Sequence, residues 1–150
     1  METRIPPPVV ALVLCALAWG ADRLLPQARI ALPGQGAVAV LLLGLGIASI
    51  LAGVLAFHAA KTTVNPLHPE RATALVVLGI YRHTRNPMYF GLLWVIAAWV
   101  VWLGQPAGLL ALPAWVSFIE RFQILPEEAA MHRLFGASFA AYCQKVRRWI

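Results

Sequence analysis

The sequence predicts an all-α integral membrane protein with about four transmembrane helices, a cytoplasmic interfacial loop and an amphipathic C-terminal helix. Apolar residues make up 61% of the 150 residues and charged residues only 12%, whereas about one-quarter of an ordinary soluble domain is charged. The apolar residues gather in runs, several of them near the roughly 20 residues that cross a bilayer as a helix. No linker or internal repeat divides the chain, so we expect a single domain over residues 1–150.

The first two predicted spans lie in the N-terminal part of the chain. The first runs from Val9 to about Leu25 and also fits the pattern of a signal peptide. We favour a span because Glu2 accompanies Arg4 ahead of it, so the positive excess of a signal peptide is missing. The second runs from Gly36 to about His58 without an Asp, Glu, Lys or Arg. Its small residues allow close packing of neighbouring helices.

The second half of the chain alternates polar and apolar segments. An apolar stretch at residues 72–80 is too short to span and is expected at the membrane interface. The third predicted span runs from about Met88 to Leu103 and the fourth from about Ala107 to Leu125, joined by a tight turn. Pro126 fits the first turn of a further helix. That helix carries an apolar stripe, formed by Met131, Phe135, Phe139, Tyr142 and Val146.

The basic residues predict the orientation of these spans. Ten of the 12 Lys and Arg residues fall on one side of the predicted topology, and only Arg23 and Arg29 fall on the other. By the positive-inside rule, both termini are expected in the cytoplasm. This rule also explains the net charge of +6, so we predict no nucleic-acid partner. The basic residues at 147 and 148, followed by Trp149, are expected to anchor the C-terminus at the interface.

Two polar clusters share the predicted cytoplasmic face, and cationic and anionic groups facing each other there could bind a zwitterion. The first cluster is also explained as interfacial anchors, and the glutamate pair of the second as the charge preference of a helix start. The four histidines show no compact metal-ligand spacing, so no metal site is predicted. The first cluster contains Tyr81, Arg82, Arg85, Asn86 and Tyr89, and the second contains Arg121, Glu127 and Glu128.

Two sequence patterns carry a resemblance to a known family. The first contains Asn65-Pro66, Pro69 to Ala72, Gly79 to Arg82 and Thr84 to Tyr89. The second contains Arg121-Phe122, Pro126-Glu127-Glu128, Phe135-Gly136, Tyr142, Val146 and Arg148. Over about residues 61–150 the chain resembles bacterial members of the isoprenylcysteine carboxyl methyltransferase and phospholipid methyltransferase superfamily.

The resemblance implies a methyltransferase of the bacterial inner membrane that uses S-adenosylmethionine, with the cofactor bound by the region of about residues 61–150. Asn86 replaces a histidine found in many relatives, and because an amide does not titrate near neutral pH, proton transfer at this position is put in doubt. The resemblance implies catalytic roles for Arg121 and Glu127. It implies cofactor binding by Tyr81, Arg82, Arg85, Asn86, Tyr89 and Glu128.

The expected acceptor is a lipophilic small molecule, a lipid or a lipid-modified molecule, and methylation of a carboxyl or of an amine group is open. Glu127 could help to remove the proton of an amine, whereas Arg121 could orient a carboxylate, which needs no base. Two alternatives remain. One is a non-catalytic membrane scaffold of the same fold. The other is a membrane enzyme similar to sterol reductases, which would need a nicotinamide cofactor.

Overall fold

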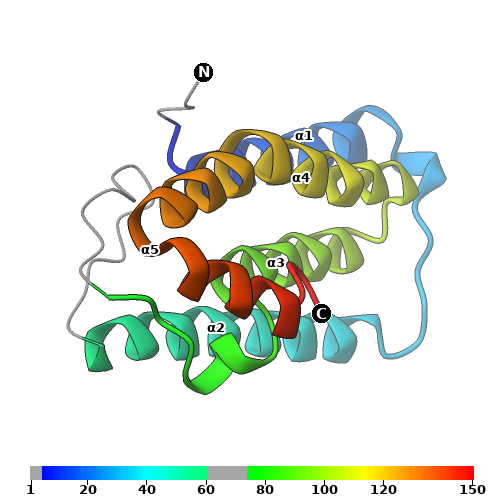
Figure 1. Cartoon of the computed structure of the whole chain (residues 1–150). Coiled ribbons are helices and arrows are strands. Elements are labelled where there is room, and N and C mark those ends of the chain that lie inside the picture. Colours follow the sequence, from blue (N-terminus) through cyan, green and yellow to red (C-terminus); the bar gives the residue numbers. More distant parts are fainter. Residues whose placement is uncertain (1–4, 61–73) are drawn as a thin grey trace.

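The computed structural model describes residues 5–60 and 74–150, and over these residues the secondary structure is entirely helical (Figure 1). The α-helices are α1 (Pro7–Leu24), α2 (Gln35–Ala59), α3 (Pro87–Leu103), α4 (Ala111–Ile119) and α5 (Leu125–Lys145). Short 3-10 helices are η1 (Pro26–Ala28), η3 (Gly79–Arg82) and η4 (Pro106–Leu110), and η5 (Glu120–Ile124) is a π-helix. The first part of the family-like pattern, residues 61–73, lies outside the described residues.

The helices confirm the predicted membrane fold. Three helical segments are long and apolar enough to cross a bilayer, namely Pro7–Leu24, Gln35–Ala59 and the continuous run Pro106–Lys145. The apolar helix α3 is shorter, with 17 residues. Proline stands within the first two positions of α1 and α3, where its missing N–H costs no hydrogen bond. These four segments correspond to the four spans expected from the sequence.

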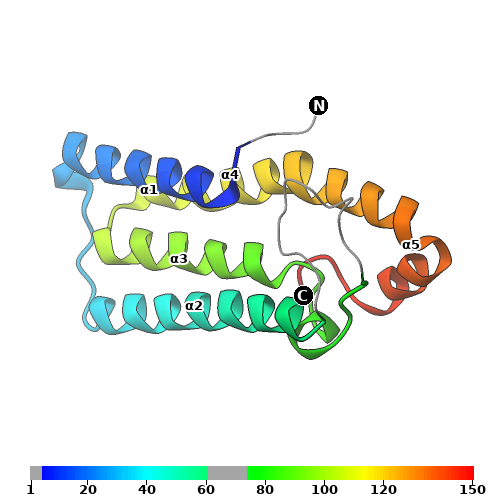
Figure 2. The same ribbon diagram turned by 90° about the vertical axis from the view of Figure 1, so that its left-hand side faces the viewer.

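Helix α3 lies between α2 on one side and the pair α1 and α4 on the other (Figure 2). The contact between α2 and α3 depends on Gly46 and Gly91. A Cβ atom at Gly46 would come 2.7 Å from the carbonyl oxygen of Gly91, so the two backbones nearly touch. On the other side of α3, Ile96 packs with the fully buried Trp115 and Ile119 of α4. These contacts hold α3 in the middle of the bundle.

The two ends of the bundle differ in their charges. At one end, the left-handed Gly104 closes the turn after α3 and accepts a hydrogen bond from the backbone of Ile30 at 2.8 Å. Arg23 and Arg29, the two basic residues predicted on the side away from the other ten, lie at this end. Arg29 pairs with the buried Asp22, and Arg23 packs over the Trp19 ring. The opposite end contains the start of α3, helix η3, α5 and the C-terminal residues (Figure 2).

Pro126 lies in the first turn of α5, as predicted, but α5 continues from the fourth span without a break. Backbone angles stay helical from Ile119 through η5 to Leu125. Pro126 has no N–H for a hydrogen bond to the preceding turn, and its ring crowds the carbonyl four residues earlier. The wider π-turn of η5 provides one way to accommodate the proline without ending the helix. The break comes ten residues later, at Gly136, with φ +48° and ψ −120°.

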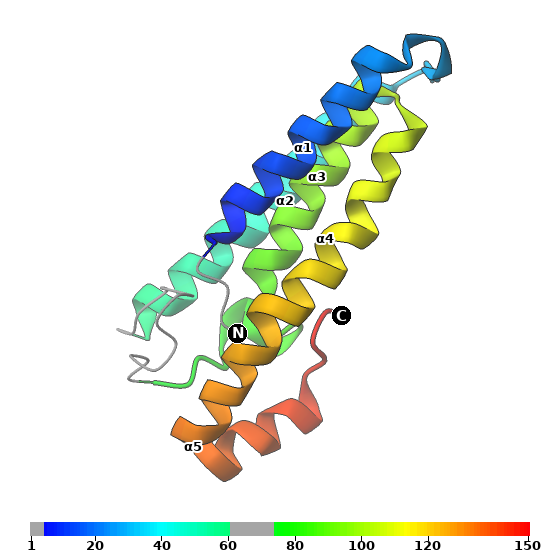
Figure 3. The ribbon, with the colours of Figure 1, turned by 90° about the horizontal axis from the view of Figure 1, so that it is seen from above.

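The bend at Gly136 returns the second half of α5 toward η3 (Figures 2 and 3). The predicted apolar stripe is confirmed, because Phe139, Tyr142 and Val146 are buried and Met131 packs beside them. The stripe packs against Leu75, so this part of the stretch at residues 72–80 contacts protein instead of lying only at the membrane interface.

Two of the C-terminal residues predicted as interfacial anchors contact the protein itself. The chain becomes extended at Val146. Trp149 then packs against the main hydrophobic core, and the Arg148 guanidinium faces carboxylates of the protein. Arg147 and Ile150 are exposed. The segment 146–150 is therefore part of the folded protein, placed beside the start of α3.

Candidate functional site

The start of α3 supplies the first part of the candidate site. Asn86 is the N-cap residue of α3 and is followed by Pro87. Its backbone N–H donates to Oγ1 of the buried Thr84 at 3.2 Å, and its side chain does not cap the helix. The Asn86 Nδ2 donates to the backbone carbonyl oxygen of Arg148 at 3.0 Å, and the Thr84 hydroxyl donates to the same oxygen at 3.3 Å. The N-terminus of α3 is thereby joined to the C-terminal residues.

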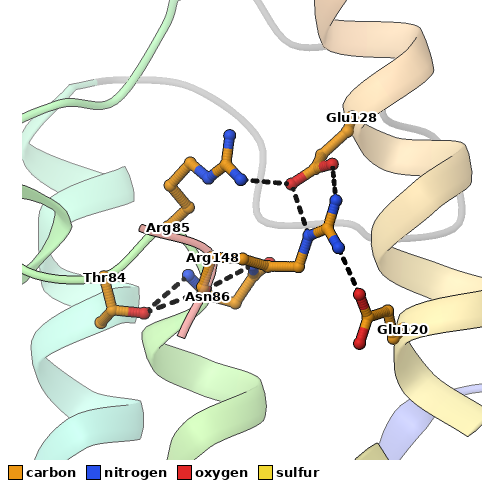
Figure 4. A network of polar contacts seen from close by, with 6 residues as sticks. All are labelled: Thr84, Arg85, Asn86, Glu120, Glu128 and Arg148. Atoms are coloured by element: carbon orange, nitrogen blue, oxygen red, sulfur yellow. Dashed lines mark hydrogen bonds and ion pairs between the residues drawn. The ribbon is translucent and has the colours of Figure 1, made fainter. Parts of the chain in front are cut away.

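A network of ion pairs lies next to these hydrogen bonds (Figure 4). Glu128 of α5 accepts from two arginines, with Arg85 at 3.1 Å and Arg148 at 2.8 Å. Arg148 also pairs with Glu120 of the π-helix η5. The side chains of Arg85 and Glu128 are only 13% and 18% exposed, so water screens this pair less than an ion pair on an open surface. Four distant sequence positions thus meet at one end of the bundle.

Glu127 faces a different neighbour from Glu128. Adjacent residues of a helix do not lie on the same face, and the Glu127 carboxylate accepts a hydrogen bond from the hydroxyl of Tyr89. Tyr89 lies one turn into α3 and is 7% exposed. Its backbone carbonyl accepts from the Trp115 indole at 3.2 Å, which ties this turn of α3 to α4. The pair Tyr89–Glu127 therefore connects the membrane-embedded bundle to the start of α5.

Tyr81 lies in η3 beside the same group of residues. Its ring meets Phe57 of α2 edge-on, with centroids 5.5 Å apart, and its backbone carbonyl accepts from the Tyr142 hydroxyl at 2.7 Å. Burial raises the pKa of the Tyr81 phenol, and the nearby Tyr142 and Glu127 raise it further. The Tyr81 hydroxyl therefore stays protonated at physiological pH and remains a hydrogen-bond donor.

Six of the eight residues predicted from the sequence come together at this end of the bundle. Two do not join them: Arg82 and Arg121 are exposed, and the Arg121 guanidinium lies 5.8 Å from the centroid of the Phe122 ring. The six are Tyr81, Arg85, Asn86, Tyr89, Glu127 and Glu128.

Sequence reasoning missed three participants, which are Thr84, Glu120 and Arg148. Arg148 could have been found, because it belongs to the family-like C-terminal pattern. It was instead interpreted as a membrane anchor because of its charge and its place beside Trp149. Glu120 precedes Arg121 in an otherwise apolar segment. A charged residue within a predicted membrane span itself indicates a polar partner.

The site offers groups of both signs to a ligand. Within the described residues, three carboxylates (Glu120, Glu127 and Glu128) accompany two guanidinium groups (Arg85 and Arg148). The Nε of Arg85 is buried and has no hydrogen-bond partner in this part of the chain. A buried donor without a partner is costly, so this atom favours an anionic group. Glu127, which accepts from a neutral hydroxyl, favours a cationic one.

Metal-binding geometry is not evident in the part of the chain that the structure describes. Within residues 5–60 and 74–150, no group of three His, Cys, Asp or Glu side chains is arranged to hold a metal ion. The described site contains arginine, carboxylate, amide and phenol groups. Such groups recognise small charged organic molecules through charge-assisted hydrogen bonds.

Comparisons with known proteins identify relatives of this sequence. A family model described as phospholipid methyltransferase matches residues 35–138, which include α2 to the bend in α5. A protein of Haemophilus influenzae described as uncharacterized is 40% identical over 63 residues, which is 42% of this chain and the whole of that protein. No solved structure matches.

Proposed function

Because the chain belongs to the phospholipid methyltransferase family, we propose that it transfers the methyl group of S-adenosylmethionine to a lipophilic acceptor at the cytoplasmic face of the membrane. The network that joins Arg85 and Asn86 to Glu128 carries this proposal. It assembles, from the start of α3 and from α5, the charged and amide groups that a zwitterionic cofactor needs. The whole chain would act as one domain, with the cofactor bound by the region of about residues 61–150.

The residues present fit the cofactor group by group. Its carboxylate is a partner for the guanidinium of Arg85, whose buried Nε lacks one among the described residues. Its ammonium group is a partner for the carboxylate of Glu128, and Asn86 and Tyr81 add hydrogen-bonding groups for its hydroxyls. When bound, S-adenosylmethionine supplies a methyl group activated by the positive charge of its sulfonium. The chain then has to orient an acceptor in line with that methyl carbon.

Glu127 is the best-placed proton acceptor of the candidate site. It is held by Tyr89 near the start of α3, next to the residues assigned to the cofactor. If the acceptor is an amine, the Glu127 carboxylate takes up its proton. Arg121 lies on the exposed side of η5, so it would orient a carboxylate acceptor only if that acceptor approaches from there. The geometry therefore favours an amine acceptor within the proposed function.

Binding of the cofactor is the first test. Calorimetric titration of purified protein in nanodiscs with S-adenosylmethionine should give saturable binding. Glu128→Gln and Asn86→Ala should each weaken it about tenfold or more, since each removes a hydrogen bond or charge worth about 1.5 to 3 kcal/mol. Gln144→Ala is the control, because it also truncates an amide but at an exposed position of α5.

The binding test has clear contrary outcomes. Unchanged affinity in both site variants would refute the assignment of these residues. Absence of cofactor binding by the unaltered protein would refute the proposed activity and favour a non-catalytic scaffold. Preferential binding of a nicotinamide cofactor would instead favour the reductase alternative.

Transfer of the methyl group is the second test. Membranes containing the protein are incubated with S-adenosylmethionine labelled on its methyl group, and the lipid fraction is separated. We expect label in lipid or another lipophilic molecule, and label that resists mild base, as methylated amines do. Base-labile label would indicate a carboxyl acceptor and contradict the role given to Glu127.

A further inference from the structure

The C-terminal residues contact the candidate site through both backbone and side chain. After α5 ends, the chain is extended at Val146 and returns to the start of α3. The backbone N–H of Arg85 donates to the carbonyl oxygen of Arg147 at 3.1 Å. The next carbonyl, that of Arg148, accepts from both Thr84 and Asn86. Three consecutive residues of the family-like motif are therefore bonded to two consecutive residues near the C-terminus.

The side chain of Arg148 pairs with carboxylates of η5 and α5. Its Nε and Nη2 donate to the two oxygens of Glu128 at 3.1 and 2.8 Å, which is a bidentate pair. Its Nη1 donates to Glu120 of η5. Bidentate pairing fixes the direction of a carboxylate as well as its distance. Hydrogen bonds to Glu128 also raise the pKa of the Arg148 guanidinium, so it is a permanent cation.

Arg148 thus contacts both parts of the candidate site, which are Asn86 at the start of α3 and Glu128 in α5. Its carbonyl oxygen fixes the amide of Asn86, and its guanidinium fixes the carboxylate of Glu128 (Figure 4). Without the guanidinium, Arg85 would be the one cationic partner left to Glu128 among the described residues, and Glu120 would lose the arginine with which it is paired. The Glu128 side chain would then be free to turn fully toward Arg85.

We propose that Arg148 is a positioning residue of the cofactor site, which orients Glu128 through its guanidinium and Asn86 through its backbone carbonyl. This inference rests on the proposed function, because it concerns the affinity for S-adenosylmethionine. The residue acts through Glu128, so its effect on binding depends on the presence of that carboxylate. The neighbouring Arg147 contributes only its backbone to the described contacts and exposes its side chain.

Titration of the full-length protein in nanodiscs with S-adenosylmethionine tests this role. We expect Arg148→Gln to weaken binding about tenfold. Arg148→Lys should recover only part of that loss, because an ammonium keeps the charge but cannot form the bidentate pair. Arg147→Gln is the matched control, since it removes the same charge one residue away and should stay within about twofold of the unaltered protein.

A double substitution separates positioning from a general effect on folding. In a Glu128→Gln background, adding Arg148→Gln should change the affinity by less than about threefold, because residues that act together are not additive. The thermal unfolding of each variant is recorded alongside. The positioning role would be overturned if the affinity losses of the two single variants multiplied in the double variant. It would also be overturned if Arg148→Gln bound the cofactor as tightly as Arg147→Gln. Absence of binding by the unaltered protein would instead refute the proposed function itself.

Discussion

Glu127 and Glu128 are neighbours in the sequence with different surroundings. Glu128 is paired with two arginines, and Glu127 accepts a hydrogen bond from the neutral Tyr89 hydroxyl. A carboxylate saturated by guanidinium groups is a poor proton acceptor, because the cations stabilise its charged form. Glu127 is therefore the better candidate for proton transfer, and Glu128 the better candidate for holding a cofactor.

This difference gives a prediction for Glu127→Gln. An amide cannot take up a proton, so if Glu127 is the general base for an amine acceptor, kcat should fall by about 10²-fold or more. The Kd for S-adenosylmethionine should change little, since Glu128, Arg85 and Asn86 remain. Single-turnover methyl transfer and calorimetry measure the two quantities separately.

Tyr89→Phe is the companion variant for this prediction. It removes the hydroxyl that orients Glu127 but leaves the carboxylate, so its kcat should fall less than that of Glu127→Gln. Retention of kcat by Glu127→Gln would contradict the general-base role. Together with base-labile product, it would point to a carboxyl acceptor, which needs no base.

At the scale of the elements, α5 is the helix whose shape the site depends on. Its first half continues the fourth span beyond the bundle, and its second half returns after the bend at Gly136 (Figures 2 and 3). The bend brings Tyr142 to Tyr81 and brings the C-terminal segment to α3. A straight α5 would carry Arg148 away from Glu120, its partner 28 residues earlier.

Gly136→Ala tests the bend. The backbone there has φ +48°, a region that residues with a Cβ atom rarely adopt, so the substitution should destabilise the fold by about 1 to 3 kcal/mol. A Cβ atom would meet no neighbour within 4 Å, so the loss would come from the backbone alone. We expect a lower Tm in detergent and weaker binding of S-adenosylmethionine.

Gly44→Ala is the matched control for this test. A Cβ atom at Gly44 also meets nothing within 4 Å, but Gly44 lies inside α2 with ordinary helical backbone. Its Tm should stay the same or rise slightly, because alanine favours helix more than glycine does. Equal Tm values for the two variants would show that Gly136 does not need its backbone freedom.

Sequence patterns predicted the elements that depend on runs or spacings of neighbouring residues. Apolar runs located the spans of α1 to α4, because burial in lipid requires them. The spacing of Phe139, Tyr142 and Val146 predicted the buried stripe of α5. The bend had no comparable signal, since Gly136 alone does not distinguish a bend from a packing position. The bend was not predicted from the sequence. For that reason the return of the C-terminal segment to α3, and the pairing of Arg148 with Glu120, could not be predicted either.

For the whole molecule, the central helix α3 links the membrane bundle to the candidate site. It contacts α1, α2 and α4, so three other helices hold it in place. Asn86 and Tyr89 stand at its N-terminal end, together with Arg85 ahead of α3, Glu120 of η5 and the glutamates of α5. The opposite end holds Arg23 and Arg29, with Arg29 paired to the buried Asp22. The candidate site therefore lies entirely at the end that is richer in described cations.

This asymmetry predicts the orientation of the protein in its membrane. Loops rich in Lys and Arg stay in the cytoplasm, and a soluble cofactor such as S-adenosylmethionine would reach the site from the same side. With Cys15 and Cys143 replaced by alanine, the exposed positions of Gln27→Cys and Gln144→Cys report on the two ends. A membrane-impermeant maleimide should label position 144 only in inside-out vesicles and position 27 only in right-side-out vesicles. The reverse pattern would place Arg85 and Glu128 away from the cytoplasm and contradict both the orientation and the proposed access of the cofactor.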